Sequence, residues 1–151
     1  MDKALILPLP FGGRWPNMAT NVSEIRRDIE KTLGFVPGFL KEVTYENPEA
    51  ESLWNLMKHY DIEESNIPPK YKHLICYAVA AAIHCPYCTP FHKLAAEMNG
   101  ATEAELREAS LHAFKTAGFS SFLHGRQYPL EQFNEDLDQL KENMQKMAGK
   151  R

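Results

Sequence analysis

The sequence predicts an all-α fold, a single-domain bundle of six or seven helices. Apolar residues recur at steps of three and four in almost every segment, which is typical of helices with one buried face. Helix start and stop signals separate these segments, and no alternating strand pattern bounded by turn residues occurs. The chain has 151 residues, long enough for one hydrophobic core, so we expect one domain over 1–151.

The first helices are predicted from their ends. Asn21 and Glu24 resemble a capping box, and Gly34 is a natural stop for the helix between them. A short helix is expected over 39–45. Asn47-Pro48 supplies a cap and a first-turn proline for a third helix.

A fourth helix is expected from Pro68-Pro69 to about Ile83. Positions 74–83 are nearly all apolar or small, so no face of this helix is left for water. We therefore expect it at the centre of the fold.

Three more helices follow the cysteine segment. One ends at Asn99-Gly100, and Thr102 with Glu105 forms a capping box for the next. The last helix covers 129–148 and carries a heptad-like seam of little more than two heptads, which packs either on its own core or against another subunit. Its members are Leu130, Phe133, Leu137, Leu140, Met144 and Met147.

Composition and charge narrow the classes of function. A net charge of −3, with Lys and Arg scattered among acids, gives no basic surface for nucleic acid or membrane. The apolar run near the N-terminus is four residues long and closed by Pro8, so we expect no signal peptide. Three cysteines, an odd number, argue against a secreted disulfide framework. We expect a cytoplasmic protein without nucleic-acid or membrane partners.

The chemistry is concentrated in one segment, which runs from His84 through Cys85 and Cys88 to His92. Two cysteines three residues apart can close a disulfide across one helical turn, and helix N-terminal amides stabilise a thiolate. His92 follows Cys88 by four residues, so in a helix the two side chains share a face. A histidine there can take the thiol proton and later protonate a leaving group. The spacing alone leaves open which cysteine attacks.

Two other interpretations of this segment remain. His84, Cys85, Cys88 and His92 are all zinc ligands by type, although structural zinc sites usually draw ligand pairs from separated segments. In the other interpretation, the cysteines are simply two small buried residues at a helix turn.

The two prolines of this segment predict its local structure. Pro86 and Pro90 do not fit one regular helix, so we expect an irregular turn followed by a helix starting near Thr89.

The CxxCxxxH motif and the following Asn99–Glu105 segment resemble the AhpD-like alkylhydroperoxidase and carboxymuconolactone decarboxylase superfamily. The resemblance covers about 30–125 and includes Leu33–Pro37. It implies an AhpD-like all-α fold and assembly as a homo-oligomer, commonly a trimer or hexamer. Decarboxylases of the superfamily generally lack the cysteine pair, so the motif favours the redox branch.

The resemblance also implies roles for individual residues. Cys88 would be the peroxidatic thiolate that attacks a hydroperoxide, and Cys85 would resolve the resulting sulfenic acid as a disulfide. His92 would relay protons. A dithiol electron donor, such as a lipoyl group on a partner protein, would regenerate the pair. No cofactor and no metal are expected.

The sequence departs from the superfamily pattern at two positions. His73 stands where the peroxidases have a relay Glu, twelve residues before the first cysteine, so it becomes the fourth candidate site residue or else a plain surface histidine at a helix start. Tyr87 stands where the best-known peroxidase has a histidine. These departures keep open a second function, a protein dithiol–disulfide oxidoreductase or redox sensor with weak peroxidase turnover. Outside redox chemistry, the alternative is a Cys/His metal-binding module.

Three further residues have simpler interpretations. His84 is expected to satisfy carbonyls at the end of the buried helix. Cys76 is expected to be a small core residue. His124 is a candidate to reach the site of a neighbouring subunit.

Overall fold

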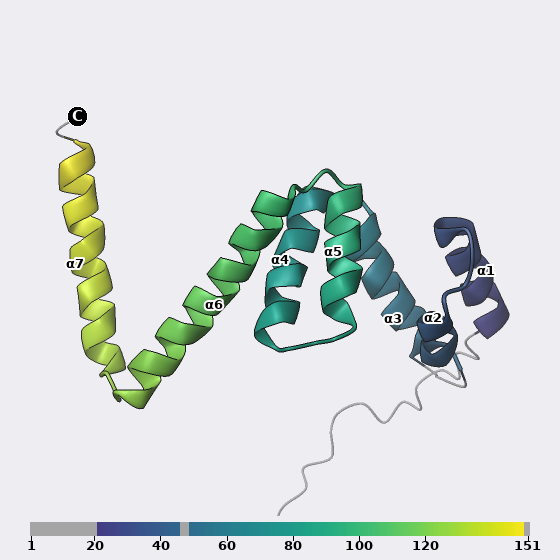
Figure 1. Cartoon of the computed structure of the whole chain (residues 1–151), viewed down its shortest axis with the longest axis horizontal. Helices are drawn as coiled ribbons and strands as arrows, with labels where there is room; N and C mark the ends of the chain where they lie inside the picture. The colour runs from purple at the N-terminus through teal and green to yellow at the C-terminus, as the bar shows by residue number, and fades with distance from the viewer. Residues whose placement is uncertain (1–20, 46–48, 150–151) are drawn as a thin grey trace, which may run out of the picture. The chain divides into compact units, whose positions relative to one another are not determined.

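The computed structural model describes residues 21–45 and 49–149. All of the regular elements there are helices, which confirms the predicted all-α fold (Figure 1). The expectations for the N-terminal apolar run and for the Asn47-Pro48 cap lie outside the described residues. In chain order the elements are α1 (Val22–Leu33), α2 (Gly38–Val43), α3 (Ala50–Met57), the π-helical turn η1 (Lys58–Ile62), α4 (Pro69–Ala82), α5 (Cys88–Met98), α6 (Glu103–Gly125) and α7 (Leu130–Ala148).

The helices gather into two units, one ending at Glu64 and one beginning at Ser65. The single domain expected over 1–151 stays a prediction. None of the described helices is long and apolar enough to cross a membrane.

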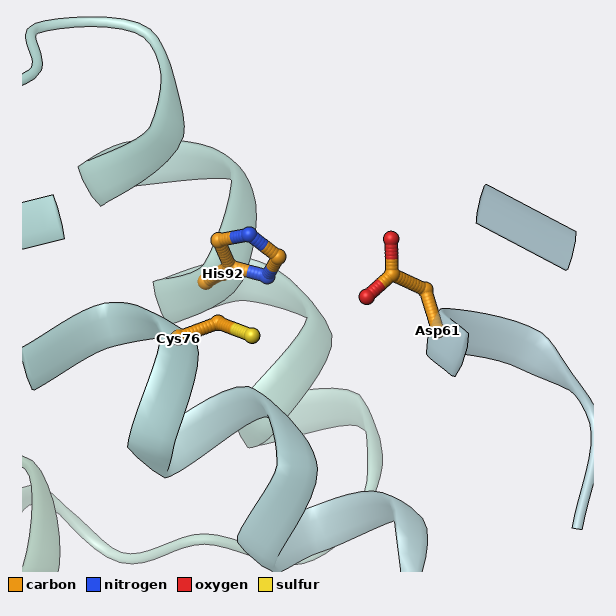
Figure 2. Close-up of side chains that lie close together, drawn as sticks. All are labelled: Asp61, Cys76 and His92. Atoms are coloured by element: carbon orange, nitrogen blue, oxygen red, sulfur yellow. The ribbon is translucent and has the colours of Figure 1, made fainter. Parts of the chain in front are cut away.

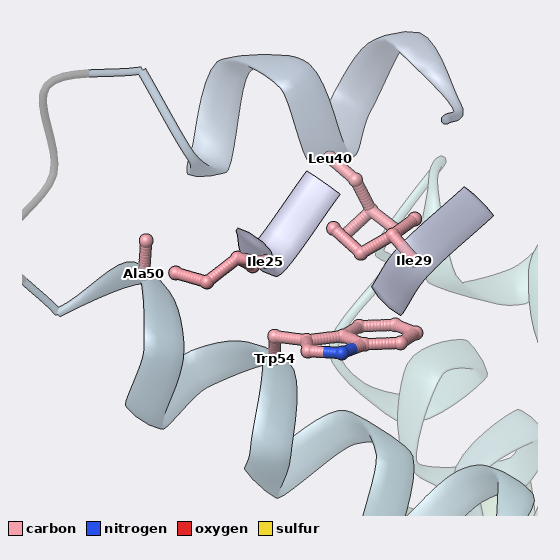
Figure 3. Close-up of a cluster of buried hydrophobic side chains, with 5 residues drawn as sticks. All are labelled: Ile25, Ile29, Leu40, Ala50 and Trp54. Carbon is pink, nitrogen blue, oxygen red and sulfur yellow. The ribbon is translucent and has the colours of Figure 1, made fainter. Parts of the chain in front are cut away.

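The first unit is organised around a small apolar cluster from three helices (Figure 3). The side chain of Asn21 accepts a hydrogen bond from the amide of Glu24 at 3.4 Å, and Gly34 ends α1 with a φ of 81°. The amphipathic pattern of α1 thereby turns one face towards α2 and α3. The buried members of the cluster are Ile25, Ile29, Leu40, Ala50 and Trp54.

Asp28 connects α1 to α3 and η1 through two hydrogen bonds. Its Oδ2 atom accepts one from the indole Nε1 of Trp54 at 2.8 Å and one from Nζ of Lys58 at 2.9 Å. The bond from Trp54, followed by the bond from Lys58, lowers the pKa of the Asp28 carboxyl. Because the Trp54 side chain is buried, its N–H needs a partner, and Asp28 supplies it.

The second unit is built on α4, which packs against both α5 and α6. The expectation that α4 is buried on every side was wrong for this chain. Ile75, Val79 and Ile83 are 51%, 54% and 67% exposed. The reason is geometric: two neighbouring helices cover two sides of α4 and leave its third side open.

The second unit is completed by α6 and α7. The predicted capping box at Thr102 and Glu105 is present, and Lys70 of α4 reaches the same carboxylate at 2.6 Å. The hydrogen bond from Lys70, then the one from the Thr102 amide, lowers the pKa of Glu105 to about 2. After α6, Gln127 adopts a φ of 50° at the turn into α7.

Candidate active site

The end of α4 positions the first cysteine. His84 adopts a left-handed conformation with a φ of 59°. The amide of Cys85 then donates to the carbonyl of Ala80 at 3.0 Å, and the amide of His84 donates to Ala81 at 3.2 Å. These two bonds form a Schellman motif, the usual way in which a left-handed residue closes a helix. The backbone of Cys85 is therefore fixed by the end of α4.

The second cysteine is the first residue of α5. The hydroxyl of Thr89 donates to the carbonyl of Cys85 at 2.8 Å, which ties the intervening turn to the new helix. Pro90 falls in the first turn of α5, where backbone amides have no partner within the helix, so its missing amide costs nothing there. The irregular turn was predicted correctly, but the helix starts one residue earlier than expected.

The two cysteine sulfurs lie 2.7 Å apart and are joined by a hydrogen bond, not by a disulfide. Both residues are half-buried. The backbone amide of Cys88 donates to Sγ of Cys85 at 3.1 Å. The hydrogen bond from the Cys88 thiol, followed by this amide, lowers the pKa of Cys85. The same sulfur–sulfur hydrogen bond, together with burial, raises the pKa of Cys88. The resting dithiol therefore forms its thiolate on Cys85.

His73 and His92 form a hydrogen-bonded pair between α4 and α5. Their Nδ1 atoms are 3.2 Å apart, and the ring centroids are separated by 5.5 Å. His73 is only 4% exposed, so the interpretation as a surface histidine was wrong. His73 lies one turn into α4, on the side that packs against α5, where its ring meets His92.

His92 is also four residues after Cys88 within the continuous helix α5. The expected shared helical face is thus present in the backbone, since residues four apart lie one above the other. The structure brings His73 and His92 together and separately brings Cys85 and Cys88 together. All four predicted site residues belong to α4, α5 and the turn that joins them.

A third cysteine, Cys76, lies beside this site (Figure 2). Its Sγ lies within 4.8 Å of a ring nitrogen of His92. The residue is half-buried. We expected Cys76 to be a small core residue, and this neighbourhood was not predicted. The sequence spacing could have predicted this position, because Cys76 follows His73 by three residues and so lies on the same side of α4.

His84 stays outside the site. Its side chain is exposed, and Nδ1 lies 3.1 Å from the carbonyl of Ala82, as expected for a residue that satisfies terminal carbonyls. No three of the zinc-type ligands His84, Cys85, Cys88 and His92 place their ligand atoms within 4.8 Å of one another. These four side chains therefore do not form a ready-made metal site.

Three comparisons with known proteins bear on this arrangement. A family model described as "Carboxymuconolactone decarboxylase family" matches residues 48–131. Among solved structures, the chain is similar to the alkylhydroperoxidase AhpD core from Rhodospirillum rubrum ATCC 11170, with a TM-score of 0.65 and 25% sequence identity. That match covers 72% of this chain and 81% of the other. No curated protein matches the sequence.

Proposed function

Because the chain belongs to the carboxymuconolactone decarboxylase family, we propose that it is a thiol-dependent peroxidase of the AhpD-like branch, which reduces hydroperoxides through a dithiol–disulfide cycle. The observation that carries the proposal is the pair of sulfurs 2.7 Å apart, one in the turn after α4 and one at the start of α5, together with a hydrogen-bonded pair of histidines on the two helices that this turn joins. Decarboxylation has no use for two adjacent thiols, whereas a peroxide-reducing cycle requires them.

The first step is attack by a cysteine thiolate on the outer oxygen of a hydroperoxide, ROOH. A sulfur–oxygen bond forms and the oxygen–oxygen bond breaks, so the sulfur becomes a sulfenic acid and RO⁻ departs. His92, protonated, gives the departing oxygen its proton and releases the alcohol ROH. In our proposal Cys88 attacks, since His92 lies one helical turn away from it.

The second step is attack by Cys85 on the sulfur of the Cys88 sulfenic acid. The disulfide forms, and hydroxide leaves and takes up a proton as water. Cys85 is suited to this step because its pKa is lowered by the hydrogen bonds from Cys88, so it loses its proton more readily than an ordinary cysteine thiol. An external dithiol then reduces the disulfide by exchange and becomes oxidised itself.

The histidine pair holds the proton that these steps move. Each neutral imidazole has one N–H and one acceptor nitrogen, so one Nδ1 atom donates to the other. The pair as a whole can take one extra proton and keep this bond. A second extra proton would place two donors face to face at 3.2 Å. His73 therefore serves as the relay partner of His92 in the position where related peroxidases have a carboxylate.

One physical effect opposes attack by Cys88. The hydrogen bonds of the resting dithiol favour the thiolate on Cys85 and the proton on Cys88. Attack by Cys88 therefore requires its proton to pass to His92 or to Cys85 as the hydroperoxide enters. If no such transfer takes place, Cys85 is the nucleophile and Cys88 resolves.

We also propose the substrates of the protein and its location in the cell. The substrates are a hydroperoxide and a dithiol electron donor, for example a lipoyl group carried by another protein. We further propose a cytoplasmic homo-oligomer, a trimer or hexamer, that acts in antioxidant defence.

The test is a count of free thiols after a slight excess of an organic hydroperoxide is added to the reduced protein. We expect the loss of two thiols in the wild type. In Cys85→Ser a sulfenic acid is trapped on Cys88, and in Cys88→Ser none forms. Cys76→Ser is the matched control, because it removes the third thiol and leaves the pair intact. A sulfenic acid only in Cys88→Ser would reverse the order of attack.

The same experiment separates the alternative functions. The thiols could survive the hydroperoxide while the oxidised cysteine pair exchanges rapidly with an external dithiol. This result would replace the peroxidase by a protein dithiol–disulfide oxidoreductase. A metal-binding module would replace both redox functions if the thiols stay unchanged, no disulfide exchange occurs and zinc co-purifies with the protein.

A further inference from the structure

Cys76 is the cysteine that the proposed cycle does not use. It lies in the middle of α4, three residues after His73, so both side chains leave the helix on the side that packs against α5. Its Sγ atom lies within 4.8 Å of a ring nitrogen of His92 on α5 (Figure 2). Cys76 is therefore a member of a cluster with two imidazoles and not an isolated thiol of the core.

A thiol beside a histidine is an arrangement that produces a nucleophile. The thiolate is the reactive form of cysteine, and a neighbouring imidazole can accept the thiol proton. At Cys76 the acceptor is the His73–His92 pair, which can take one extra proton and keep the hydrogen bond of 3.2 Å between its rings. The proton then stays inside the cluster, so the thiolate forms without adding a net charge to this part of the protein.

The charge of Cys76 also acts on the redox pair. The hydrogen bond with Cys85, followed by burial, raises the pKa of Cys88, and the charge of Cys76 adds to this effect in the same direction. Interactions between charges weaken with distance, so Cys76 lies near enough to Cys88 for one thiol to influence the other. The third thiol is thus coupled both to the histidine pair and to the dithiol.

We propose that Cys76 is a modification site, at which a small disulfide RSSR forms a mixed disulfide that blocks the relay through His92. The Cys76 thiolate attacks one sulfur of RSSR, a new sulfur–sulfur bond forms and the old one breaks. The Cys76 sulfur is oxidised, and the released RS⁻ is the reduced product. It leaves as RSH with the proton that the histidine pair had accepted. An external dithiol reverses the reaction by the same exchange.

The modification regulates the active site because of where the added group must lie. Cys76 is half-buried on the side of α4 that packs against α5, so a group on its sulfur enters the contact beside His92. Extra atoms in a packed contact force the neighbouring side chains to move. We expect the His92 ring to lose its hydrogen bond to His73, while Cys85 and Cys88 keep theirs. Peroxide reduction then stops until a dithiol restores the thiol, a consequence that rests on the proposed function.

The disulfide of the cycle allows Cys76 to be modified alone. Once diamide has oxidised Cys85 and Cys88, Cys76 is the remaining thiol, because the chain has three cysteines. In one arm the oxidised full chain is treated with hydroxyethyl disulfide, and the adduct is located by peptide mapping. In the other arm it is treated with iodoacetamide, and dithiothreitol then reduces the pair while the alkyl group stays on Cys76. Cys76→Ser, carried through both arms, is the matched control.

The two arms have separate expected results. Hydroxyethyl disulfide should add once per oxidised chain, on Cys76, and about tenfold more slowly in His92→Ala, because the thiolate loses its proton acceptor. After alkylation and reduction, kcat/KM for an organic hydroperoxide should fall by about 10²-fold, as for loss of a proton-transfer partner. The Cys76→Ser protein should keep its own rate through the same treatment. Circular dichroism checks that the helix content is unchanged.

Four results would overturn the proposal or part of it. An adduct that forms only after unfolding would mean that Cys76 is no reactive site. Equal or faster addition in His92→Ala would exclude activation by the imidazole. Undiminished peroxide reduction by the alkylated protein would exclude the block. Addition to Cys76 needs no hydroperoxide, so a reactive Cys76 in a protein that reduces none would refute the proposed function and the regulation together, and leave the modification site.

Discussion

Nδ1 of His73 and Nδ1 of His92 face each other at 3.2 Å, so only one of the two atoms carries the hydrogen of their hydrogen bond. This relationship couples the protonation states of two rings, one on α4 and one on α5, the helices that the CxxC segment joins. In the proposed cycle His73 takes the place of a relay carboxylate, since either group can accept a hydrogen bond from the ring of His92.

Replacement of His73 should therefore slow peroxide reduction. We expect His73→Leu to lower kcat/KM for an organic hydroperoxide by about 10²-fold, the lower range for loss of a proton-transfer partner. His73→Glu should retain activity, because a carboxylate also accepts a hydrogen bond from Nδ1 of His92. Steady-state rates over a range of pH measure both. Equal rates for His73→Leu and the wild type would exclude the relay.

The dithiol should be alkylated first on Cys85. Hydrogen bonds from Cys88 lower the pKa of Cys85, so its thiolate forms at a lower pH than that of Cys88. In Cys88→Ala the sulfur donor is lost, and the pH midpoint for alkylation of Cys85 should rise. In Cys85→Ala the corresponding midpoint of Cys88 should fall. Iodoacetamide labelling with peptide mapping at each pH measures these midpoints, and earlier labelling of Cys88 in the wild type would refute the assignment.

Asp28 should stabilise the first unit at neutral pH and lose this effect in acid. Its folded pKa lies below the unfolded value, so the contribution is complete above the unfolded pKa, near 4, and is lost as pH falls through the folded pKa. Asp28→Ala should lower the free energy of unfolding by about 1 kcal/mol, because the buried Trp54 N–H loses its partner. Urea unfolding monitored by tryptophan fluorescence tests this, and the difference from the wild type should shrink at low pH.

His84→Gly should stabilise the second unit. A left-handed conformation costs a non-glycine residue about 1 kcal/mol, and glycine adopts it without that cost. We expect a higher midpoint of thermal unfolding and unchanged reactivity of the two thiols, since the Schellman bonds to Cys85 use only backbone atoms. A lower midpoint would show that the contact of the His84 ring with the Ala82 carbonyl outweighs the strain.

The sequence was sufficient to predict most helix ends, because caps such as Thr102 with Glu105 are local. The CxxC spacing likewise placed the two thiols correctly, since three residues cannot separate them far. The His73–His92 pair could not be derived from spacing, because it depends on how α4 packs against α5. The exposure of Val79 and Ile83 was missed for a similar reason, since hydrophobicity does not say how much of a helix surface the neighbouring helices cover.

The central claim is tested most directly by a single-turnover experiment on the reduced protein without an electron donor. An organic hydroperoxide is added in excess, and the alcohol formed and the thiols lost are measured in the same sample. The proposed chemistry predicts one alcohol for every two thiols lost, with a Cys85–Cys88 disulfide in the peptide map and Cys76 still reduced. Alcohol formation without loss of these two thiols, or no alcohol at all, would contradict it.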